Sequence, residues 1–273
     1  MARLIIEPGR IEREYWRDLW RYRELFYVLA WRDVSVRYKQ TVIGVLWALL
    51  QPLLTMIVFT VIFNRIAKMP AQEGIPYPLL VLAGTLPWQF FSTALAGASQ
   101  SLVGNANLIS KVYFPRLIIP TSSVVTAFID LLIGFSLMLA AMAWYQFLPP
   151  WQIIFLPFFV VLAFLTALGP GLLITALNVK YRDFRYIIPF TLQLGYFVSP
   201  VGYASGHVGD KWKLLYSLNP VVGVIDGFRW SLLGGENQID PRSFGLSLAV
   251  TAALLVWGIS YFRRTERTFA DVI

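Results

Sequence analysis

The chain has 273 residues, of which 57% are hydrophobic and only 14% are charged. Soluble domains carry about 45–50% apolar and about 25% charged residues, so these proportions exclude an ordinary soluble protein. Aromatic residues make up 16% of the chain, which excludes an intrinsically disordered protein. The composition therefore predicts an integral membrane protein.

The charge balance indicates basic cytoplasmic loops rather than nucleic-acid binding. The formal net charge is +8, from 23 Lys and Arg against 15 Asp and Glu. In a membrane protein such an excess reflects basic loops that stay in the cytoplasm, so we expect no nucleic-acid partner. The chain has no cysteine and a single histidine, which excludes disulfides, thiolate metal sites and repeated imidazole motifs. We therefore expect no metal site.

Residues 1–41 are predicted to form a cytoplasmic segment that contains an amphipathic helix. Residues 1–40 hold nine Lys or Arg and six Asp or Glu, too many charges for the hydrocarbon of a bilayer. Apolar side chains recur at the spacing of one helical face, at Ile11, Tyr15, Leu19, Tyr22, Phe26 and Leu29. Because tryptophans flank this stripe, we expect the helix to lie in the membrane interface. A soluble helix packed on a partner is the alternative.

Six apolar stretches are predicted to span the membrane, giving an all-α fold. They are residues 42–63, 78–101, 117–147, 151–178, 186–198 and 244–262. The first would reach about 33 Å as a helix, just more than the hydrocarbon core. The fifth is short and is broken by Pro189, so it spans only if it is tilted or if the bilayer thins.

The stretch 214–233 is also apolar, but its composition favours a broken, re-entrant element. Pro220, Gly223 and Gly227 interrupt it, and two charged residues lie inside it. Such a segment is tolerated at membrane depth only where protein buries it.

The distribution of basic residues predicts the orientation. Seventeen Lys and Arg lie in the proposed cytoplasmic segments 1–41, 104–116, 179–185 and 263–273, against six in the proposed outer loops 64–77 and 199–243. Because short basic loops stay inside, both termini are predicted to be cytoplasmic and the region 201–243 to lie on the outer side.

Catalytic constellations are missing from the sequence. It has no glycine-rich phosphate loop, no serine elbow and no His/Glu metal pair, so we expect no enzyme activity in this chain. Asp130 lies near the middle of the third predicted span. It is either a functional carboxylate or a helix-packing group, hydrogen-bonded to a neighbouring Ser or Thr or protonated. One such residue and no internal repeat argue against an ion-coupled transporter.

Two cytoplasmic loops are candidates for docking a partner protein. Residues 105–114 are predicted to form a short amphipathic helix that Asn105 or Asn107 caps and Pro115 ends. A plain interfacial turn is the alternative, and the loop 178–185 either docks a partner as well or only retains topology. The candidate docking residues are Asn107, Leu108, Ile109, Val112 and Tyr113 in the first loop and Tyr181, Arg182 and Asp183 in the second.

Several motifs, in order from about residue 20 to the C-terminus, resemble those of the polysaccharide-export permeases of ATP-binding-cassette transporters. In the first half they are Arg32-Asp33, Arg37-Tyr38-Lys39-Gln40-Thr41-Val42-Ile43-Gly44, Trp47 with Gln51-Pro52, Ala83-Gly84-Thr85-Leu86-Pro87-Trp88, and Asn107-Leu108-Ile109 with Tyr113-Phe114-Pro115. In the second half they are Asn178 with Tyr181-Arg182-Asp183, Ser199-Pro200-Val201-Gly202-Tyr203, Asn219-Pro220 and Gly227-Phe228-Arg229. The family includes permeases for O-antigen, capsular polysaccharide and teichoic acid.

The resemblance implies an assembly and a substrate. Two six-span subunits would form a homodimer, among membrane lipids, on two copies of a separate ATPase. That ATPase would bind ATP and Mg²⁺, so this chain would need no cofactor of its own. The substrate would be a lipid-linked polysaccharide that crosses the bacterial inner membrane. The runner-up is a small-molecule or drug exporter of the same class, and a membrane glycosyltransferase is a more distant alternative.

In the resemblance, short outer helices between the fifth and sixth spans form a gate, which here would include Asn219 and Pro220. Asp226 and Arg229 are three residues apart and so share a helix face. We expect them to brace this gate, as a pair or through bonds to adjacent outer helices. A partly solvated pair that contributes little is the alternative.

Aromatic residues inside the predicted spans suggest the route of the polymer. We expect a channel at the dimer interface, formed mainly by the first and fifth spans, in which sugar rings pack on aromatic faces. Packing against lipid or neighbouring helices is the alternative for each of these side chains. The candidate residues are Phe59, Phe63, Tyr196 and Phe197, with Trp88 and Phe91 on the second span and Gln193 as a polar partner.

Overall fold

The structure, a computed structural model, describes residues 12–39, 42–68, 74–207, 209–234 and 239–269. Within these ranges the chain forms helices and connecting segments, without a strand. The predicted N-terminal segment, outer region and cytoplasmic tail lie partly outside them. The all-α fold is therefore confirmed for the described part of the chain.

Five helical segments are long and apolar enough to cross a membrane, and they overlap the first four and the last of the predicted spans. They are Val45–Ile66, Tyr77–Gly104, Ile118–Trp144, Trp151–Lys180 and Pro241–Thr268. The helices that form them are α3 (Val42–Phe59) with the π-helix η1 (Thr60–Ile66), α4 (Tyr77–Gly104), α6 (Ile118–Trp144), the 3-10 helix η2 (Trp151–Phe155) with α7 (Leu156–Lys180), and α11 (Pro241–Thr265) with η4 (Glu266–Thr268).

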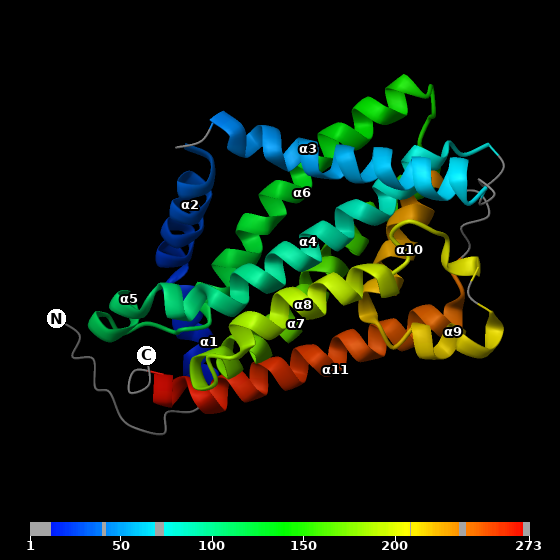
Figure 1. Ribbon diagram of the computed structural model, residues 1–273. Helices are drawn as coiled ribbons and strands as arrows, with labels where there is room; N and C mark the ends of the chain where they lie inside the picture. The colour runs from blue at the N-terminus through cyan, green and yellow to red at the C-terminus, as the bar shows by residue number, and fades with distance from the viewer. Residues whose placement is uncertain (1–11, 40–41, 69–73, 208, 235–238, 270–273) are drawn as a thin grey trace.

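The remaining predicted span corresponds to α8 (Phe184–Val198), which is too short to count among the five. Its 15 residues rise about 22 Å, short of the hydrocarbon thickness. The helix continues through Pro189, so the predicted break there is wrong. Proline removes one helical hydrogen bond, and neighbouring groups in a membrane protein compensate for that loss. Figure 1 shows α8 running alongside the long helices.

α4 lies at the centre of the helix assembly, in contact with α6, α7 and α10 (Pro220–Leu233) (Figure 1). Within its most apolar stretch 72% of the residues are buried, the largest share among the five long segments. The main hydrophobic core follows this helix from Leu79 to Ala98. A helix that is apolar on all sides is stable only when it is covered by other helices or by lipid.

α7 and α11 cross at two glycines. A Cβ atom on Gly169 would lie 2.8 Å from the backbone N of Leu255, so the two backbones touch without side chains between them. Gly258 faces Gly169 from α11. Close by, the hydroxyls of Thr166 and Thr251 are hydrogen-bonded at 3.2 Å. Small residues and hydroxyl groups of this kind join helices inside membranes.

α3 is covered on one side only, by α4 and α6. Only 6% of the residues in its most apolar stretch are buried, and Figure 1 shows it along one edge of the molecule. Trp47, Leu54 and Val58 recur at helical spacing on its open face, each about half exposed. The chain thus has an apolar helix face that it does not cover itself.

The predicted re-entrant stretch 214–233 divides into the end of α9 (Asp210–Tyr216) and the whole of α10. The side chain of Asn219 caps α10 by accepting a hydrogen bond from the backbone N–H of Val221 at 3.2 Å. Pro220 follows as the first residue of the helix, where its missing N–H is not needed. The predicted break therefore lies just before Pro220.

The two glycines of α10 do not interrupt it, contrary to the prediction. A Cβ atom on Gly223 would lie 2.7 Å from the Cβ of Ser247 in α11, and Gly227 packs directly against the ring of Phe159 in α7. Both glycines are places where α10 approaches its neighbours most closely. Tertiary packing here outweighs their low helix propensity.

The predicted N-terminal helix is divided into α1 (Glu12–Arg21) and α2 (Arg23–Lys39), of which only α1 is strongly amphipathic. Ile11 lies outside the described residues, and the rest of the predicted stripe packs against the ends of α4, α6 and α11 as a second core cluster. Trp16, Trp20 and Trp31 are exposed. The stripe is thus covered by this chain itself, and it needs no partner helix. The members of the stripe in this cluster are Tyr15, Leu19, Tyr22, Phe26 and Leu29.

Candidate functional site

Asp130, in the middle of α6, forms an ion pair with a residue of α2. Nη2 of Arg37 lies 2.8 Å from Oδ2 of Asp130, and the hydroxyl of Tyr38 donates a hydrogen bond to Oδ1. Burial raises the pKa of Tyr38, and the bond to Asp130 adds to this effect, so the phenol stays protonated and able to donate. The partner is therefore an arginine with a tyrosine, and not the Ser or Thr of the packing hypothesis.

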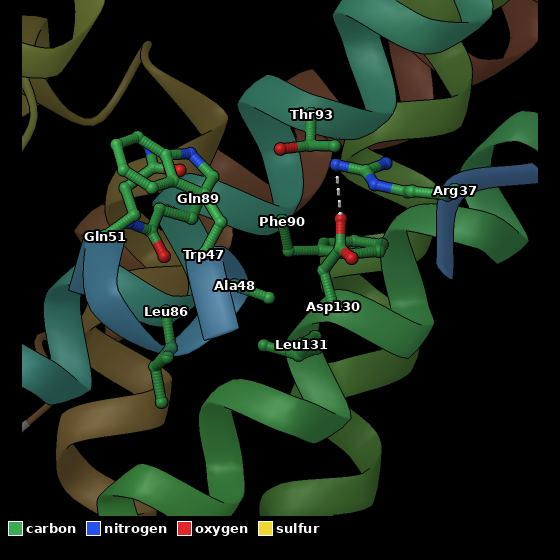
Figure 2. Close-up of a pocket in the computed structure, with 10 residues that line it drawn as sticks. All are labelled: Arg37, Trp47, Ala48, Gln51, Leu86, Gln89, Phe90, Thr93, Asp130 and Leu131. Carbon is green, nitrogen blue, oxygen red and sulfur yellow. Dashed lines mark ion pairs between the residues drawn. The ribbon is translucent and has the colours of Figure 1, made fainter. Parts of the chain in front are cut away.

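A cavity of about 150 Å³ lies beside this pair, between α2, α3, α4 and α6 (Figure 2). We call it the polar cavity. Figure 2 shows Trp47, Gln51 and Gln89 on one side of it and Thr93, Arg37 and Asp130 on the other. Its apolar lining consists of Ala48, Leu86, Phe90 and Leu131.

The aromatic residues predicted to line a channel form one connected group, which we call the aromatic cluster. Ring centroids of successive members lie 5.3 to 5.9 Å apart, within the range of favourable aromatic pairs. The cluster joins α3 and η1 to α4 and α8. Its members in order of contact are Phe63, Phe59 and Tyr196, with Phe197 and Trp88 each next to Tyr196 and Phe91 next to Trp88.

Members of the aromatic cluster differ in exposure. Trp88 is 5% exposed and packs on α8, where a Cβ atom on Gly195 would lie 2.9 Å from its ring. Phe197 is 66% exposed. Gln193, one turn earlier on α8, is exposed as well and lies outside the cluster. The structure thus brings the six predicted aromatics together, with Trp88 as an inner support, and leaves Gln193 apart from them.

Arg229 of α10 binds the connection that follows α8, and its side chain is 1% exposed. Nη1 donates to the carbonyl of Tyr203 at 2.8 Å, and Nη2 donates to that of Val201 at 3.0 Å. Nε donates to the carbonyl of Leu80 in α4 at 3.3 Å. Arg229 therefore bonds to neighbouring segments, which was one of the two predicted alternatives. The other alternative, a partly solvated pair, is wrong because the side chain of Arg229 is buried.

Gly84 and Asp226 complete the surroundings of Arg229. A Cβ atom on Gly84 of α4 would lie 2.8 Å from Nη2 of Arg229, so only glycine leaves room for the guanidinium there. Asp226, one turn earlier on α10, lies near Arg229 and near Ser205 of η3 (Ser205–His207), and its charge compensates that of the guanidinium. Arg229 thus combines bonds to backbone carbonyls with the charge of Asp226.

The predicted docking helix is shorter than expected. α5 covers Ala106–Lys111, and the chain is extended at Val112, so Val112 and Tyr113 do not continue the helical face of Leu108 and Ile109. Valine and tyrosine have low helix propensity, and Pro115 favours an extended residue before it. Asn107, Val112 and Tyr113 are exposed, whereas Ile109 is buried.

Neither asparagine caps α5 as predicted. Asn105 precedes the helix without a capping bond, because its Nδ2 donates to the carbonyl of Ser101 at 2.8 Å and its Oδ1 accepts from Nη2 of Arg32 at 2.9 Å. Asn107 lies inside the helix. Asn105 therefore connects the end of α4 to α2.

The second docking loop is attached by Asn178, whose Nδ2 donates to the carbonyl of Ser99 in α4 at 2.8 Å. Tyr181, Arg182 and Asp183 are exposed at its tip. The three predicted docking residues are thus accessible, and Asn178 positions them.

A further cluster, where α1 meets the end of α11, is absent from the sequence predictions. Tyr15 donates to Oε2 of Glu266 at 2.9 Å, Nε of Arg263 lies 3.8 Å from Oε1, and Arg116 donates to the backbone carbonyl of Glu266. Burial, and then the charge of Glu266, raises the pKa of Tyr15. The sequence hint that could have revealed this cluster is Glu266, a carboxylate that stands between Arg264 and Arg267. The cluster joins α1, the end of the first docking loop and α11.

The amino-acid sequence is similar to those of known membrane transport proteins. Residues 24–233 match the family described as ABC-2 type transporter. The chain is 30% identical to the O-antigen export system permease protein RfbA of Myxococcus xanthus, over 94% of this chain and 98% of that protein. It is 21% identical to the polysialic acid transport protein KpsM of Escherichia coli, over 86% and 91% of the two chains. It is 22% identical to the inner membrane transport permease YadH of Escherichia coli K12, over 77% and 86%.

The matched residues include the polar cavity, the aromatic cluster, both docking loops and Arg229. They make up well over half of the chain, and the long apolar helices agree with a multi-pass membrane protein. The chain belongs to the ABC-2 type transporter family.

Proposed function

We propose that the chain is the permease subunit of an ATP-driven exporter that moves a lipid-linked polysaccharide across the inner membrane. The names of RfbA and KpsM favour a polymer of the O-antigen or capsule class. The observation that carries the proposal is the aromatic cluster, which lies between the uncovered side of α3 and the exposed side of α8.

The aromatic cluster suits a sliding polymer. Sugar rings present apolar C–H faces that pack on aromatic rings, whereas their hydroxyls keep contact with water or with amides such as Gln193. Aromatic platforms hold successive units of a strand without reading their identity. Many weak contacts let the polymer move on, as multi-site binding does in ion pores.

A second copy of this chain would complete the route. α3 has an uncovered apolar face with Leu54 and Val58, and α8 exposes Tyr186, Phe190 and Phe197 at helical spacing. Such faces suit a two-fold symmetric contact in which each surface meets its counterpart. In this homodimer α8 would be the sixth span, and the route would lie between the two copies.

The driving force would come from two copies of a separate ATPase, which bind ATP and Mg²⁺. The sequence of this chain has no phosphate-binding loop. Figure 1 shows α5 and the loop between α7 and α8 at the same end of the molecule as α1 and the end of α11. A partner seated on Asn107, Val112 and Tyr113, with Tyr181 and Arg182 as lesser contacts, could transmit its closure as a rigid-body shift.

The outer end would be closed by α9, α10 and the segment that Arg229 fastens. Because Arg229 bonds to backbone carbonyls on two sides, α10 and the connection after α8 would move together as one gate element. Asp226, Asn219 and Pro220 would fix the ends of this element.

Export by aromatic variants tests this function. A strain that lacks the chain should retain its polymer inside the cell, and the wild-type gene should restore surface polymer. Substituting Phe59, Tyr196 and Phe197 with Ala together should reduce export at least about tenfold, the equivalent of about 1.4 kcal/mol in a rate. Assembly with the ATPase should persist, as measured by co-purification.

Trp144→Ala and Trp257→Ala serve as matched controls, because both residues are exposed aromatics outside the cluster. They should export normally. Surface polymer that is unchanged in the deletion strain would contradict polysaccharide export and favour a small-molecule exporter. Full export by the triple variant would remove the aromatic cluster from the route.

A further inference from the structure

The polar cavity contains side chains that the chain itself leaves unsatisfied. Among the described residues, Gln51, Gln89 and Thr93 line the cavity without a side-chain hydrogen bond. Each amide can donate and accept, and so can the hydroxyl. All three side chains are at least partly accessible, so their polar atoms are available from the cavity. The cavity therefore offers hydrogen-bonding groups to an occupant that can both donate and accept.

The charges around the cavity favour a neutral occupant. Asp130 is balanced by Arg37 at 2.8 Å, so the lining has one negative and one positive group. A carboxylate has about four lone-pair positions, which leaves room for bonds beyond those from Arg37 and Tyr38. A phosphate would be repelled by Asp130, and a cation would be repelled by Arg37. A hydroxyl-rich, uncharged molecule meets neither difficulty.

The shape of the cavity favours a single ring. Its volume of about 150 Å³ is well below the roughly 300–1,000 Å³ of sites for drug-sized ligands. The indole of Trp47 stands at one side as a flat apolar surface (Figure 2). A sugar ring has an apolar C–H face and polar hydroxyls at its edge. The aromatic face matches the first, and the neighbouring amides, hydroxyl and carboxylate match the second.

The cavity also has access to the proposed route. Trp47 and Gln51 are exposed on α3, the helix whose open face is assigned to the dimer interface. On α4, Gln89 and Thr93 alternate in sequence with Trp88 and Phe91 of the aromatic cluster. The polar cavity and the aromatic cluster are thus built on the same turns of α4.

We propose that the polar cavity binds one uncharged hexopyranose unit of the exported polymer. The ring packs on Trp47, and its hydroxyls bond to Gln51, Gln89, Thr93 and Asp130. This inference rests on the proposed function, because the polymer supplies the sugar. It adds a stationary binding site to a route of otherwise weak, sliding contacts.

Cysteine protection tests the site. The chain has no native cysteine, so Ala48→Cys places a single thiol in the cavity lining. The full chain, in lipid with its ATPase, is treated with N-ethylmaleimide with and without oligosaccharides released by mild acid from the exported polymer. At a sugar concentration about ten times the dissociation constant, alkylation should slow about tenfold. Ser110→Cys, exposed on α5, should show no protection.

Variants of the lining give the matched comparison. Gln89→Leu and Thr93→Val, each with Ala48→Cys, should abolish protection. Thr85→Val is the same change two turns earlier on α4 and outside the cavity, so it should leave protection intact.

Each remaining outcome overturns the inference. Equal alkylation with and without oligosaccharides, in a chain that exports polymer, would mean that the cavity holds water only. Protection that survives Gln89→Leu with Thr93→Val, or that inorganic phosphate produces equally well, would contradict a neutral sugar site. A chain that exports no polymer would instead refute the proposed function, whatever the alkylation rate.

Discussion

Asp130 and Arg229 are charged residues that lie among apolar helices, and they are accommodated differently. Asp130 meets the opposite charge of Arg37, on a helix far earlier in the chain. Arg229 donates to three backbone carbonyls and also lies near the charge of Asp226. Both arrangements satisfy the requirement that a charge inside a membrane protein be paired or hydrogen-bonded.

Removing one partner of the Arg37–Asp130 pair should destabilise the chain more than removing both. A fully buried pair loses about 3–5 kcal/mol when one member is truncated, because the other charge stays unpaired. The side chain of Arg37 is partly exposed, so the loss here should be smaller. Thermal unfolding in detergent of Arg37→Met, Asp130→Leu and the double variant gives the coupling energy.

The pair Arg32–Asp33 provides the control. Its charged atoms lie 2.7 Å apart, but Asp33 is more exposed than Asp130 and both members of this pair belong to α2. Truncating Asp33 should change stability by less than about 1 kcal/mol. Additive losses in the Arg37 and Asp130 cycle would mean that the two charges do not depend on each other.

At the scale of helices, α10 and α11 each begin with a side-chain cap, as local rules predict. Asp240 precedes α11 and accepts hydrogen bonds from the backbone N–H of Ser243 at 3.2 Å and from its hydroxyl at 2.5 Å. These bonds satisfy donors that a helix start leaves free. The bond from Ser243 lowers the pKa of Asp240, so the ionised form is the capping form.

Asp240→Ala should lower the free energy of unfolding by about 1 kcal/mol, the usual contribution of a helix cap. Because the pKa is lower in the folded chain, the contribution is complete above about pH 3.9, the ordinary value for Asp, and is lost as the pH falls through the folded value. Thermal unfolding at pH 7 and at about pH 3 measures both. A difference between wild type and variant that stays constant over this range would exclude ionisation as the cause.

Local rules also explain which helices the sequence could predict. The segments Val45–Ile66 and Ile118–Trp144 lie within a few residues of the predicted 42–63 and 117–147, because apolar length alone defines them. Gly223 and Gly227 were expected to break α10. They are contact points with helices distant in sequence, and no local pattern carries that information.

The candidate site was predictable to a similar extent. The grouping of the aromatic cluster could be predicted from the spans, because it depends mainly on which end of a span each ring occupies. The partner of Asp130 depends on how α2 lies across α6, and the bonds of Arg229 depend on a loop that returns to α10. Contacts of this kind are set by the tertiary fold, which the spacing of residues does not determine.

At the scale of the whole molecule, orientation is the main prediction that stays to be tested. The distribution of basic residues predicts that both termini lie in the cytoplasm. A membrane-impermeant maleimide added to intact cells should label Leu148→Cys and Ser205→Cys but label Thr268→Cys and Tyr186→Cys only after permeabilisation. The contrast between positions 186 and 205, on either side of α8, determines whether this short helix crosses the bilayer.

Leu148 is 88% exposed in the connection between α6 and α7, so its failure to react from outside would reverse the orientation. Equal labelling at positions 186 and 205 would place both ends of α8 on one side and leave five spans. With five spans, the two termini would lie on opposite sides of the membrane.

If the proposed homodimer forms, the uncovered face of α3 affects how long an unassembled subunit persists in the cell. A newly inserted chain holds its first long helix against the rest of the fold on one side only, and lipid would cover the other side until a second copy binds. An unassembled subunit therefore resembles a chain whose folding is incomplete. Membrane proteases that extract loosely held helices would remove it, so assembly rather than synthesis would set how many exporters a cell maintains.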